Sequence, residues 1–381
     1  MPLTVGFDAT PAVRQGGGIG RYTRELLRAL AELDTANQYR LFYAAPRGAP
    51  AYPLPPLPGN FRTRPLGFDD IWLARVWHRA QLPLPVEWIT GPIDLFHSPD
   101  FTLPPTRRGT RTLLTVHDLS FVRDPESALP VLRNYLNQVV PRSVARADLV
   151  LADSRATRAD LIELYGAAPE KIAVLYSGVT ASFRPVRDAP ALQAVRARYG
   201  LGSQPFILAV GTLQPRKNYV RLIQAFARLA DNDLRLVIAG GQGWLFEAIF
   251  AEVQRLGLGE RVIFPGFASD EDLPALYSAA SVFAYPSLYE GFGLPILEAF
   301  ACGTPVVTST ASCLPEVAGE AALLVAPTDV EALRDALQRA LEDADLRARL
   351  TAAGIARARL FSWSRSAREL LALYQGLMDR L

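Results

Sequence analysis

The chain has 381 residues, of which half are hydrophobic and a fifth are charged, a composition typical of a globular protein. Its length exceeds what one hydrophobic core usually supports, so two domains are expected. No apolar run reaches the ~18 residues of a membrane-spanning helix, and no basic segment of the kind that opens a signal peptide precedes the first apolar run. The net charge of +2 argues neither for nor against nucleic acid. Cys302 and Cys313 form neither a disulfide framework nor a zinc pattern, which fits a reducing cytosol.

In the first half of the chain, short apolar runs alternate with segments of helical periodicity. Residues 45–66 are rich in proline and glycine and are expected to form a loop. The expected strands are residues 3–7, 39–44, 95–97, 112–116, 149–152 and 171–175. The expected helices are residues 21–33, 71–79, 131–146 and 156–165.

The second half repeats this alternation, which predicts a parallel sheet with helices on both faces in each half. The interdomain linker is expected within residues 182–205, and an amphipathic tail ends the chain. The expected strands are residues 206–210, 235–239, 261–264, 282–285, 305–308 and 322–325. The expected helices are residues 219–230, 244–256, 272–279, 295–301 and 330–343. The resulting domain limits are residues 1–185, 186–362 and 363–381.

The segment that runs from Glu290 to Glu298 carries the strongest functional signal. It follows an apolar strand, and its glycines allow a sharp turn and a close approach to a ligand. A proline then opens a helix, so the N–H groups of Phe292, Gly293 and Leu294 should point at one place, where an anion can bind. Glu290 and Glu298 border that place, and carboxylates accept hydrogen bonds from sugar hydroxyls. A nucleotide-sugar combines a phosphate with hydroxyls.

A second segment supplies positive charge directly after the strand at residues 206–210. It begins with a glycine turn and contains an arginine beside one of the two lysines of the chain, Gly211-Thr212-Leu213-Gln214-Pro215-Arg216-Lys217-Asn218. Arginine offers a planar fork and lysine a compact charge, which together suit a diphosphate. Cations fixed there stabilise a leaving nucleoside diphosphate as its negative charge develops.

The two segments resemble the Glu-x7-Glu and Arg-Lys motifs of retaining glycosyltransferases of family 4, and the resemblance extends over nearly the whole chain. It implies the α/β fold called GT-B, with two Rossmann-like domains facing a central cleft and a C-terminal helix that crosses back to the N-terminal domain. It assigns Glu298 to the ribose hydroxyls and Glu290 to the sugar. Arg216 and Lys217 hold the diphosphate, and Gly211, Thr212, Asn218 and Phe267 complete the donor site.

Two further sites are expected in the first half. The loop at residues 16–20 follows the first strand, and a dinucleotide fingerprint there is disfavoured because the glycine spacing is wrong. The resemblance implies instead that Gly17 and Gly18 approach the donor phosphates. It also implies that His117, at the end of a strand, lies near the sugar and stabilises developing charge. His97 either lines the acceptor side or is structural.

The resemblance implies transfer of a hexose from a nucleotide-sugar to a glycan or lipid-linked saccharide, with GDP-mannose favoured and a UDP-sugar as the alternative donor. Neither a cofactor, a metal nor a nucleic acid is expected. An epimerase of the same fold and a non-catalytic sugar-binding assembly subunit remain open. The protein is expected in the cytoplasm, with peripheral membrane contact through a cluster of aromatic and basic residues, Trp72, Arg75, Trp77, Arg79 and Trp88.

Overall fold

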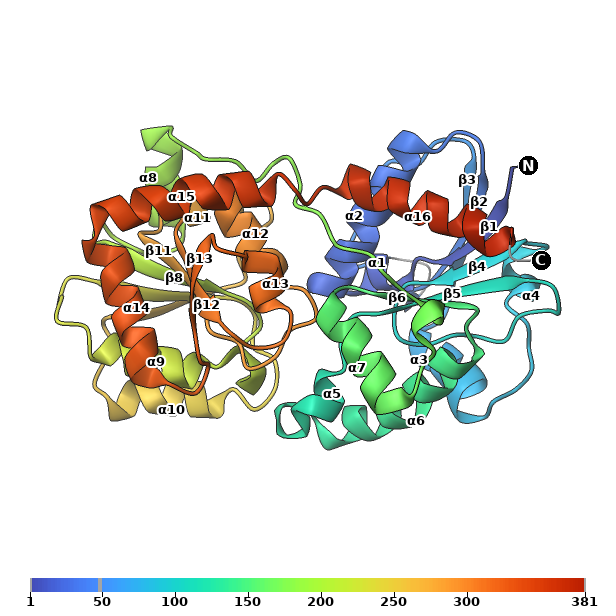
Figure 1. Ribbon diagram of the computed structural model, residues 1–381, viewed down its shortest axis with the longest axis horizontal. Helices are drawn as coiled ribbons and strands as arrows, with labels where there is room; N and C mark the ends of the chain where they lie inside the picture. Colours follow the sequence, from blue (N-terminus) through green and yellow to red (C-terminus); the bar gives the residue numbers. More distant parts are fainter. Residues whose placement is uncertain (1, 47–49, 380–381) are drawn as a thin grey trace. The chain divides into compact units, whose positions relative to one another are not determined.

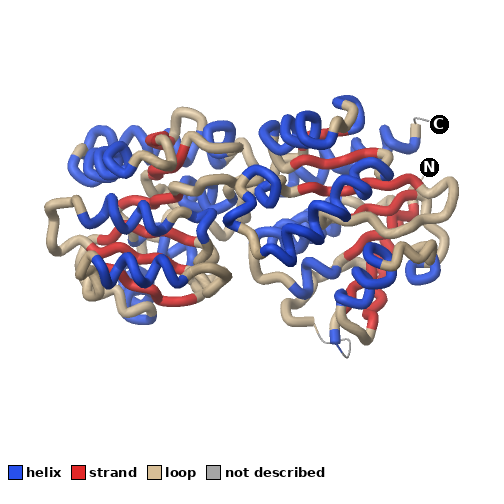
Figure 2. Tube along the Cα trace, turned by 90° about the horizontal axis from the view of Figure 1, so that it is seen from below, coloured by secondary structure: helices blue, strands red, loops and turns tan. Residues whose placement is uncertain are grey.

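The computed structural model describes residues 2–46 and 50–379, and it divides into two compact units. Unit 1 comprises the chain up to Val122, Pro130–Gly178 and the C-terminal segment from Trp363. Unit 2 comprises Arg123–Leu129 and Val179–Ser362. Each unit has its own sheet, and helices lie on both faces of each sheet (Figures 1 and 2). The predicted pair of parallel α/β sheets is therefore confirmed.

The sheet of unit 1 has the strand order β3-β2-β1-β4-β5-β6-β7, and every pair of neighbours is parallel. The order reverses direction between β1 and β4, which is where ligands bind in open parallel sheets. The strands are β1 (Thr4–Asp8), β2 (Gln38–Ala44), β3 (Phe61–Leu66), β4 (Leu95–Ser98), β5 (Arg111–Val116), β6 (Leu149–Ala152) and β7 (Ile172–Val174).

The expectation of a loop over residues 45–66 is wrong at its end, where β3 forms the edge of the sheet. Only the first and last residues of β3 are buried, so the apolar pattern of a core strand is missing. Pro65 is tolerated because one side of an edge strand has no ladder partner. Hydrophobic periodicity cannot reveal such a strand, since it depends on burial.

Long helices cover the sheet of unit 1, and the C-terminal helix α16 (Trp363–Met378) packs on α2 (Gly18–Leu33) (Figure 1). Residues 71–79, expected as one helix, form α3 (Asp70–Leu73) followed by a π-helical turn, η2 (Ala74–Arg79). The remaining helices are α1 (Thr10–Arg14), α4 (Glu87–Thr90), α5 (Ser120–Arg123), α6 (Pro130–Arg146) and α7 (Arg155–Tyr165), with 3-10 turns η3 (Pro125–Ser127) and η4 (Pro169–Lys171).

The sheet of unit 2 has the order β10-β9-β8-β11-β12-β13 and is also parallel, with its reversal between β8 and β11. Its strands are β8 (Phe206–Val210), β9 (Arg235–Ala239), β10 (Val262–Gly266), β11 (Val282–Tyr285), β12 (Val306–Ser309) and β13 (Ala322–Val325). Its helices are α8 (Ala189–Arg198), α9 (Tyr219–Ala227), α10 (Glu247–Arg255), α11 (Leu273–Ala279), α12 (Leu294–Ala301), α13 (Leu314–Ala318), α14 (Val330–Glu342) and α15 (Ala344–Ala358), with the 3-10 turn η5 (Pro215–Lys217).

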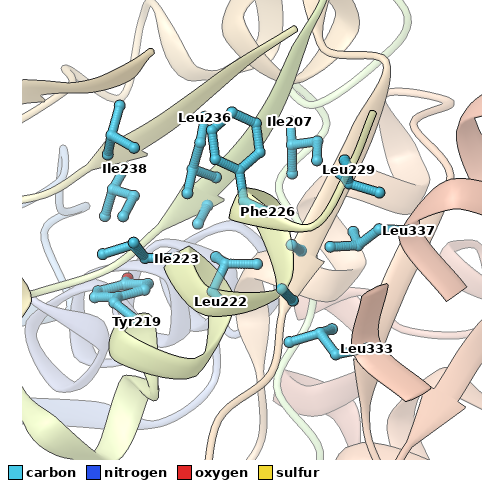
Figure 3. Packing of buried hydrophobic residues seen from close by; sticks show 14 of the residues in the cluster. Ile207, Tyr219, Leu222, Ile223, Phe226, Leu229, Leu236, Ile238, Leu333 and Leu337 are labelled. Atoms are coloured by element: carbon cyan, nitrogen blue, oxygen red, sulfur yellow. The ribbon is translucent and has the colours of Figure 1, made fainter. Parts of the chain in front are cut away.

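The core of unit 2 forms where helix α9 lies against strands β8 and β9 (Figure 3). Leu222 and Phe226 of α9 are fully buried and pack with Ile207 and Leu236 of the sheet. Leu337 of α14 closes the same cluster. Each buried aliphatic or aromatic side chain contributes about 1.5–3 kcal/mol of transfer free energy. This packing fixes the ends of β8 and the start of α9, between which the cationic segment lies.

Candidate functional site

The cationic segment lies in the connection between β8 and α9. Gly211 has φ = 150°, a left-handed conformation that favours glycine, and its carbonyl accepts a 3.1 Å hydrogen bond from the Tyr219 hydroxyl. Gly240, after β9, packs so closely that a Cβ atom there would lie 2.0 Å from the Gly211 oxygen. The turn is thereby locked, and it places Arg216 and Lys217 of η5 beyond the end of the sheet.

Glu290 joins these two cations from the other side of the topological reversal, because it follows β11. Its Oε2 accepts a 2.7 Å hydrogen bond from Arg216 Nη1, and its Oε1 accepts one of 2.7 Å from Lys217 Nζ. Burial alone would raise the pKa of Glu290, but the charges of Arg216 and Lys217 outweigh it and lower that pKa to about 2. Glu290 is therefore a carboxylate at any physiological pH.

Two further contacts hold the cations in place. Arg216 Nη1 also donates to the carbonyl of Tyr289 at 2.7 Å. Lys217 Nζ donates to the hydroxyl of Tyr285, the last residue of β11, at 2.8 Å. Tyr285 was not predicted as part of the site, because an aromatic residue at the end of a buried strand is usually a core residue.

The main chain around Glu290 is fixed by residues that precede α13. The Glu290 N–H donates to Ser312 Oγ at 2.9 Å. The buried thiol of Cys313 donates to the carbonyls of Glu290 and Phe292, at 3.2 and 3.1 Å. Gly293 then turns the chain into α12 with φ = 98°. The expectation of Gly293 at the helix entrance is confirmed, whereas Ser312 and Cys313 were missed as supports of this loop.

Helix α12 carries Glu298 on its buried face. Its side chain is 2% exposed, and Oε2 accepts a 2.9 Å hydrogen bond from the hydroxyl of Tyr277 on α11. At the start of the helix, Phe292 is buried and Leu294 is half-buried. Glu290 and Glu298 thus have different partners, two cations for the first and a neutral hydroxyl for the second.

The other expected donor residues of unit 2 lie at the same edge of the sheet but differ in exposure. Phe267 follows β10 and is 61% exposed, so its ring is accessible to a flat ligand. Thr212 is half-buried in the turn after Gly211. Asn218 is buried, and its amide donates to the carbonyls of Pro286 and Pro327, at 2.9 and 2.6 Å. Asn218 therefore ties the cationic segment to neighbouring loops.

In unit 1, His117 follows β5 and is held between two acceptors. Its Nδ1 lies 2.7 Å from Asp153 Oδ2, and its Nε2 lies 2.8 Å from the Pro99 carbonyl. The ring of Tyr22 packs edge-on against the His117 ring, with 5.0 Å between the ring centroids. Since both ring nitrogens face acceptors, both must donate, and the ring is an imidazolium. Asp153 directly follows β6, and its contact with His117 was not predicted.

His97 is structural, which settles the two interpretations that the sequence left open. Its side chain is completely buried, with Nδ1 2.7 Å from the Tyr374 hydroxyl and Nε2 3.0 Å from Thr115 Oγ1. Burial lowers the pKa of His97 to about 3, so the ring is neutral. Its partner Tyr374 belongs to α16, so His97 anchors the C-terminal helix to unit 1.

The glycine loop opens helix α2. Gly17 is the N-cap and Gly18 the first helical residue, and a Cβ atom at either would meet nothing within 4 Å. A Cβ atom at Gly20 would instead lie 1.8 Å from the carbonyl oxygen of Gln15, so only glycine fits there. Space at Gly17 and Gly18 is compatible with a ligand, and Gly20 has a packing role.

The described residues contain neither a group that could hold a metal ion nor a helix that could span a membrane. Across residues 2–46 and 50–379, no group of three or more His, Cys, Asp or Glu side chains is arranged to hold a metal ion. In that same part of the chain, no helix has both the length and the apolar character needed to cross a bilayer.

Comparison with known proteins identifies the family of the chain. Residues 16–183 match the family described as Glycosyltransferase Family 4, and residues 193–357 match Glycosyl transferases group 1. O-antigen chain mannosyltransferase B of Escherichia coli is 32% identical over 374 residues, which cover 94% of this chain and 96% of that protein. The serotype-specific mannosyltransferase WbdA of Escherichia coli is 33% identical over 282 residues, which cover 71% of this chain and 34% of WbdA. Sucrose-phosphate synthase of Thermosynechococcus elongatus has the same fold, with a TM-score of 0.78 at 25% identity over 100% of both chains.

Proposed function

The chain belongs to glycosyltransferase family 4 and is a hexosyltransferase with the GT-B fold, and from this premise we propose that it moves mannose from GDP-mannose to a glycan or lipid-linked saccharide. The observation that carries the proposal is the pairing of Arg216 and Lys217 with Glu290 at the topological reversal of unit 2. Cations for a diphosphate and a carboxylate for sugar hydroxyls meet there.

The proposed roles follow from the chemistry of each group. Arg216 and Lys217 bind the diphosphate and stabilise the charge that grows on it as the bond to the sugar breaks. The main-chain N–H groups at the start of α12 add to this anion site. Glu298 accepts hydrogen bonds from the ribose hydroxyls, and Phe267 flanks the base. Arg216 and Lys217 supply the positive charge that a metal would otherwise bring.

The transfer step needs charge stabilisation at the sugar as well as at the phosphate. Glu290 accepts hydrogen bonds from the sugar hydroxyls and balances the positive charge of an oxocarbenium-like carbon. His117 is already protonated and therefore cannot act as a general base. Both of its N–H groups are engaged, by Asp153 and by the Pro99 carbonyl, so its proposed role is to stabilise developing negative charge through its own positive charge. The acceptor hydroxyl attacks on the face that the phosphate leaves, and the leaving phosphate oxygen takes its proton, which retains the configuration.

Mannose is favoured as the transferred sugar because a relative that is 32% identical over 94% of this chain is a mannosyltransferase. At 32% identity that likeness supports the choice of sugar, and a UDP-sugar stays the alternative donor. Nothing in the comparisons supports the epimerase alternative. A cytoplasmic location, where nucleotide-sugars are available, belongs to the same proposal.

A donor screen tests the proposal directly. The purified protein is mixed with GDP-mannose, GDP, UDP-glucose or UDP, and its melting temperature and donor hydrolysis are measured. GDP-mannose is expected to give the largest thermal shift and slow release of mannose. Lys217→Ala and Glu290→Ala should abolish transfer in protein that remains folded. Full transfer activity in both variants, or no shift with any nucleotide, would refute the assignment.

Peripheral membrane contact is proposed through one exposed surface of unit 1. Ile71 and Trp72 of α3 are 55% and 56% exposed, and the Arg75 guanidinium lies 5.1 Å from the centroid of the Trp72 ring. Arg79 of η2 lies 5.7 Å from the Tyr135 ring of α6, so the start of α6 borders the same surface. Exposed apolar side chains beside arginines suit an anionic bilayer. Trp77, expected in this cluster, is instead buried and donates to the Leu84 carbonyl.

Vesicle flotation tests this surface. The protein should float with vesicles that contain phosphatidylglycerol and remain free with phosphatidylcholine alone. The double variant Ile71→Ser, Trp72→Ser should lose most of this binding. Leu360→Ser, which removes a comparably exposed apolar side chain from unit 2, is the matched control and should retain it. Equal flotation of both variants would place the contact elsewhere.

A further inference from the structure

We propose that Glu290 is a built-in counter-ion that takes the place of the diphosphate in the ligand-free protein and releases Arg216 and Lys217 only when a diphosphate arrives. The inference rests on the proposed function, since it concerns the same site. It also gives an order of events at that site. Glu290 binds the two cations before the donor arrives and binds the sugar hydroxyls afterwards.

The Glu290 carboxylate already accepts hydrogen bonds from the two cationic groups that a phosphate would need. Glu290 Oε2 lies 2.7 Å from Arg216 Nη1, and Glu290 Oε1 lies 2.7 Å from Lys217 Nζ. The side chains of Arg216, Lys217 and Glu290 are 17%, 10% and 7% exposed. A phosphoryl group would use the same N–H donors with the same charge-assisted hydrogen bonds. Glu290 and a bound phosphate therefore compete for the two cations.

The exchange requires only that the Glu290 side chain turn. Its main chain is held by Ser312 at the N–H and by Cys313 at the carbonyl. The cations also have anchors that do not involve the carboxylate, the Tyr289 carbonyl for Arg216 and the Tyr285 hydroxyl for Lys217. When Glu290 turns away, both cations can stay where they are. The site is thus preorganised for the incoming anion at no cost in backbone rearrangement.

The charges determine the direction of the exchange. Two cations and one carboxylate leave one net positive charge, and a diphosphate carries more negative charge than a carboxylate, so it can displace Glu290. Once displaced, Glu290 is available to the hydroxyls of the sugar. After transfer, the return of Glu290 to the cations favours release of the nucleoside diphosphate. A free hexose carries no diphosphate, so it cannot displace Glu290 from the cations. The carboxylate is therefore not available to bind a free hexose.

The test measures binding of GDP, UDP and inorganic diphosphate by calorimetry, without any sugar present. In Glu290→Gln the competing charge is gone, so inorganic diphosphate and the preferred nucleotide should bind about 10- to 100-fold more tightly than to the wild type. Glu298→Gln is the matched control, because it also neutralises a buried carboxylate but one bonded to a tyrosine hydroxyl. It should show no gain in affinity for inorganic diphosphate.

The outcomes separate this inference from the proposed function. If no variant binds any nucleotide or diphosphate, the proposed function fails. If the wild type binds them and Glu290→Gln binds equally or more weakly, the counter-ion role is overturned while the proposed function stands. Glu290→Asp covers the case in which the glutamine variant does not fold. Its carboxylate is one methylene shorter and cannot keep both contacts, so a smaller gain in affinity is expected, and an unchanged affinity overturns the inference.

Discussion

Replacing Asp153 with asparagine tests whether His117 is held as a cation. In the wild type, burial alone would lower the pKa of His117. The charge and hydrogen bond of Asp153, the charge of Asp100 and the bond to the Pro99 carbonyl outweigh burial and raise that pKa to about 9. Of the other groups facing the ring, His97 is neutral and Tyr22 contributes only an aromatic edge. Asp153 is therefore the main source of the shift.

The structure gives the size of the expected change. Asparagine keeps the shape of the side chain and removes its charge. If the centres of the two charges are taken as roughly 4 Å apart, with an effective dielectric constant of about 20, the lost attraction is about 4 kcal/mol, or about 3 pH units. In Asp153→Asn, the pKa of His117 should thus fall from about 9 to about 6 or below. His117 would then be neutral at pH 7.5.

The same shift sets the pH dependence of stability. The pKa of His117 in the folded protein, about 9, lies above the value of 6.5 in the unfolded chain. Its stabilising effect is therefore complete below pH 6.5 and is lost as the pH rises through 9. This difference corresponds to about 3 kcal/mol of unfolding free energy. The asparagine variant should lack this loss of stability between pH 6.5 and 9.

Histidine-selective NMR provides the assay, because the chain has only three histidines. Burial lowers the pKa of His78 to about 4 and that of His97 to about 3, so the His117 titration stands alone above neutral pH. Asp118→Asn is the matched control, since Asp118 adjoins His117 in sequence but accepts a 2.9 Å hydrogen bond from the Ser120 N–H. A wild-type His117 that titrates near 6.5, or an equal shift in both variants, refutes the reasoning.

Three further expectations follow from the same contacts. Tyr374→Phe removes the hydroxyl that lies 2.7 Å from Nδ1 of the buried His97 ring. It should lower the free energy of unfolding by about 1–3 kcal/mol in denaturant titrations, without changing the transfer rate. An unchanged unfolding midpoint would contradict the anchoring role of His97. Tyr277→Phe removes the hydroxyl that orients Glu298 and should raise KM for the nucleotide-sugar severalfold at nearly constant kcat, whereas a fall in kcat alone would argue against ribose binding. EDTA should leave transfer unaffected, because paired side-chain cations supply the charge, and an activity restored by Mg²⁺ would disprove this.

The fold was largely predictable because parallel strands are buried on both faces. Strand β8 was predicted at its observed limits, since four of its five residues are buried and it reads as a continuous apolar run. Strand β3 was missed for the opposite reason, because four of its six residues are exposed. Prediction from apolar patterns thus succeeds at the centre of each sheet and fails at its edge.

The chemical groups of the site were predictable, but their partners were not. The family resemblance assigned Glu290 to the sugar and Lys217 to the diphosphate. Nothing in the sequence indicated that the two side chains form a hydrogen-bonded ion pair with each other. They are separated by 73 residues and meet because β8 and β11 are neighbours in the sheet. One sequence does not reveal which strands are neighbours. His97 is a similar case, since its partner Tyr374 is 277 residues away.

The buried ion pairs His117–Asp153 and Glu290–Lys217 have a feature in common that stability alone does not explain. His117–Asp153 lies beyond the ends of β5 and β6, and Glu290 with Lys217 lies beyond the ends of β11 and β8. Replacing a buried ion pair by apolar side chains is often neutral or stabilising, because desolvation offsets the attraction. A fold selected only for stability therefore has little use for such charges. Their position at the strand ends, where open parallel sheets bind ligands, is what a protein that handles a charged substrate requires. Apolar replacement of either pair should accordingly leave a folded protein that has lost its substrate.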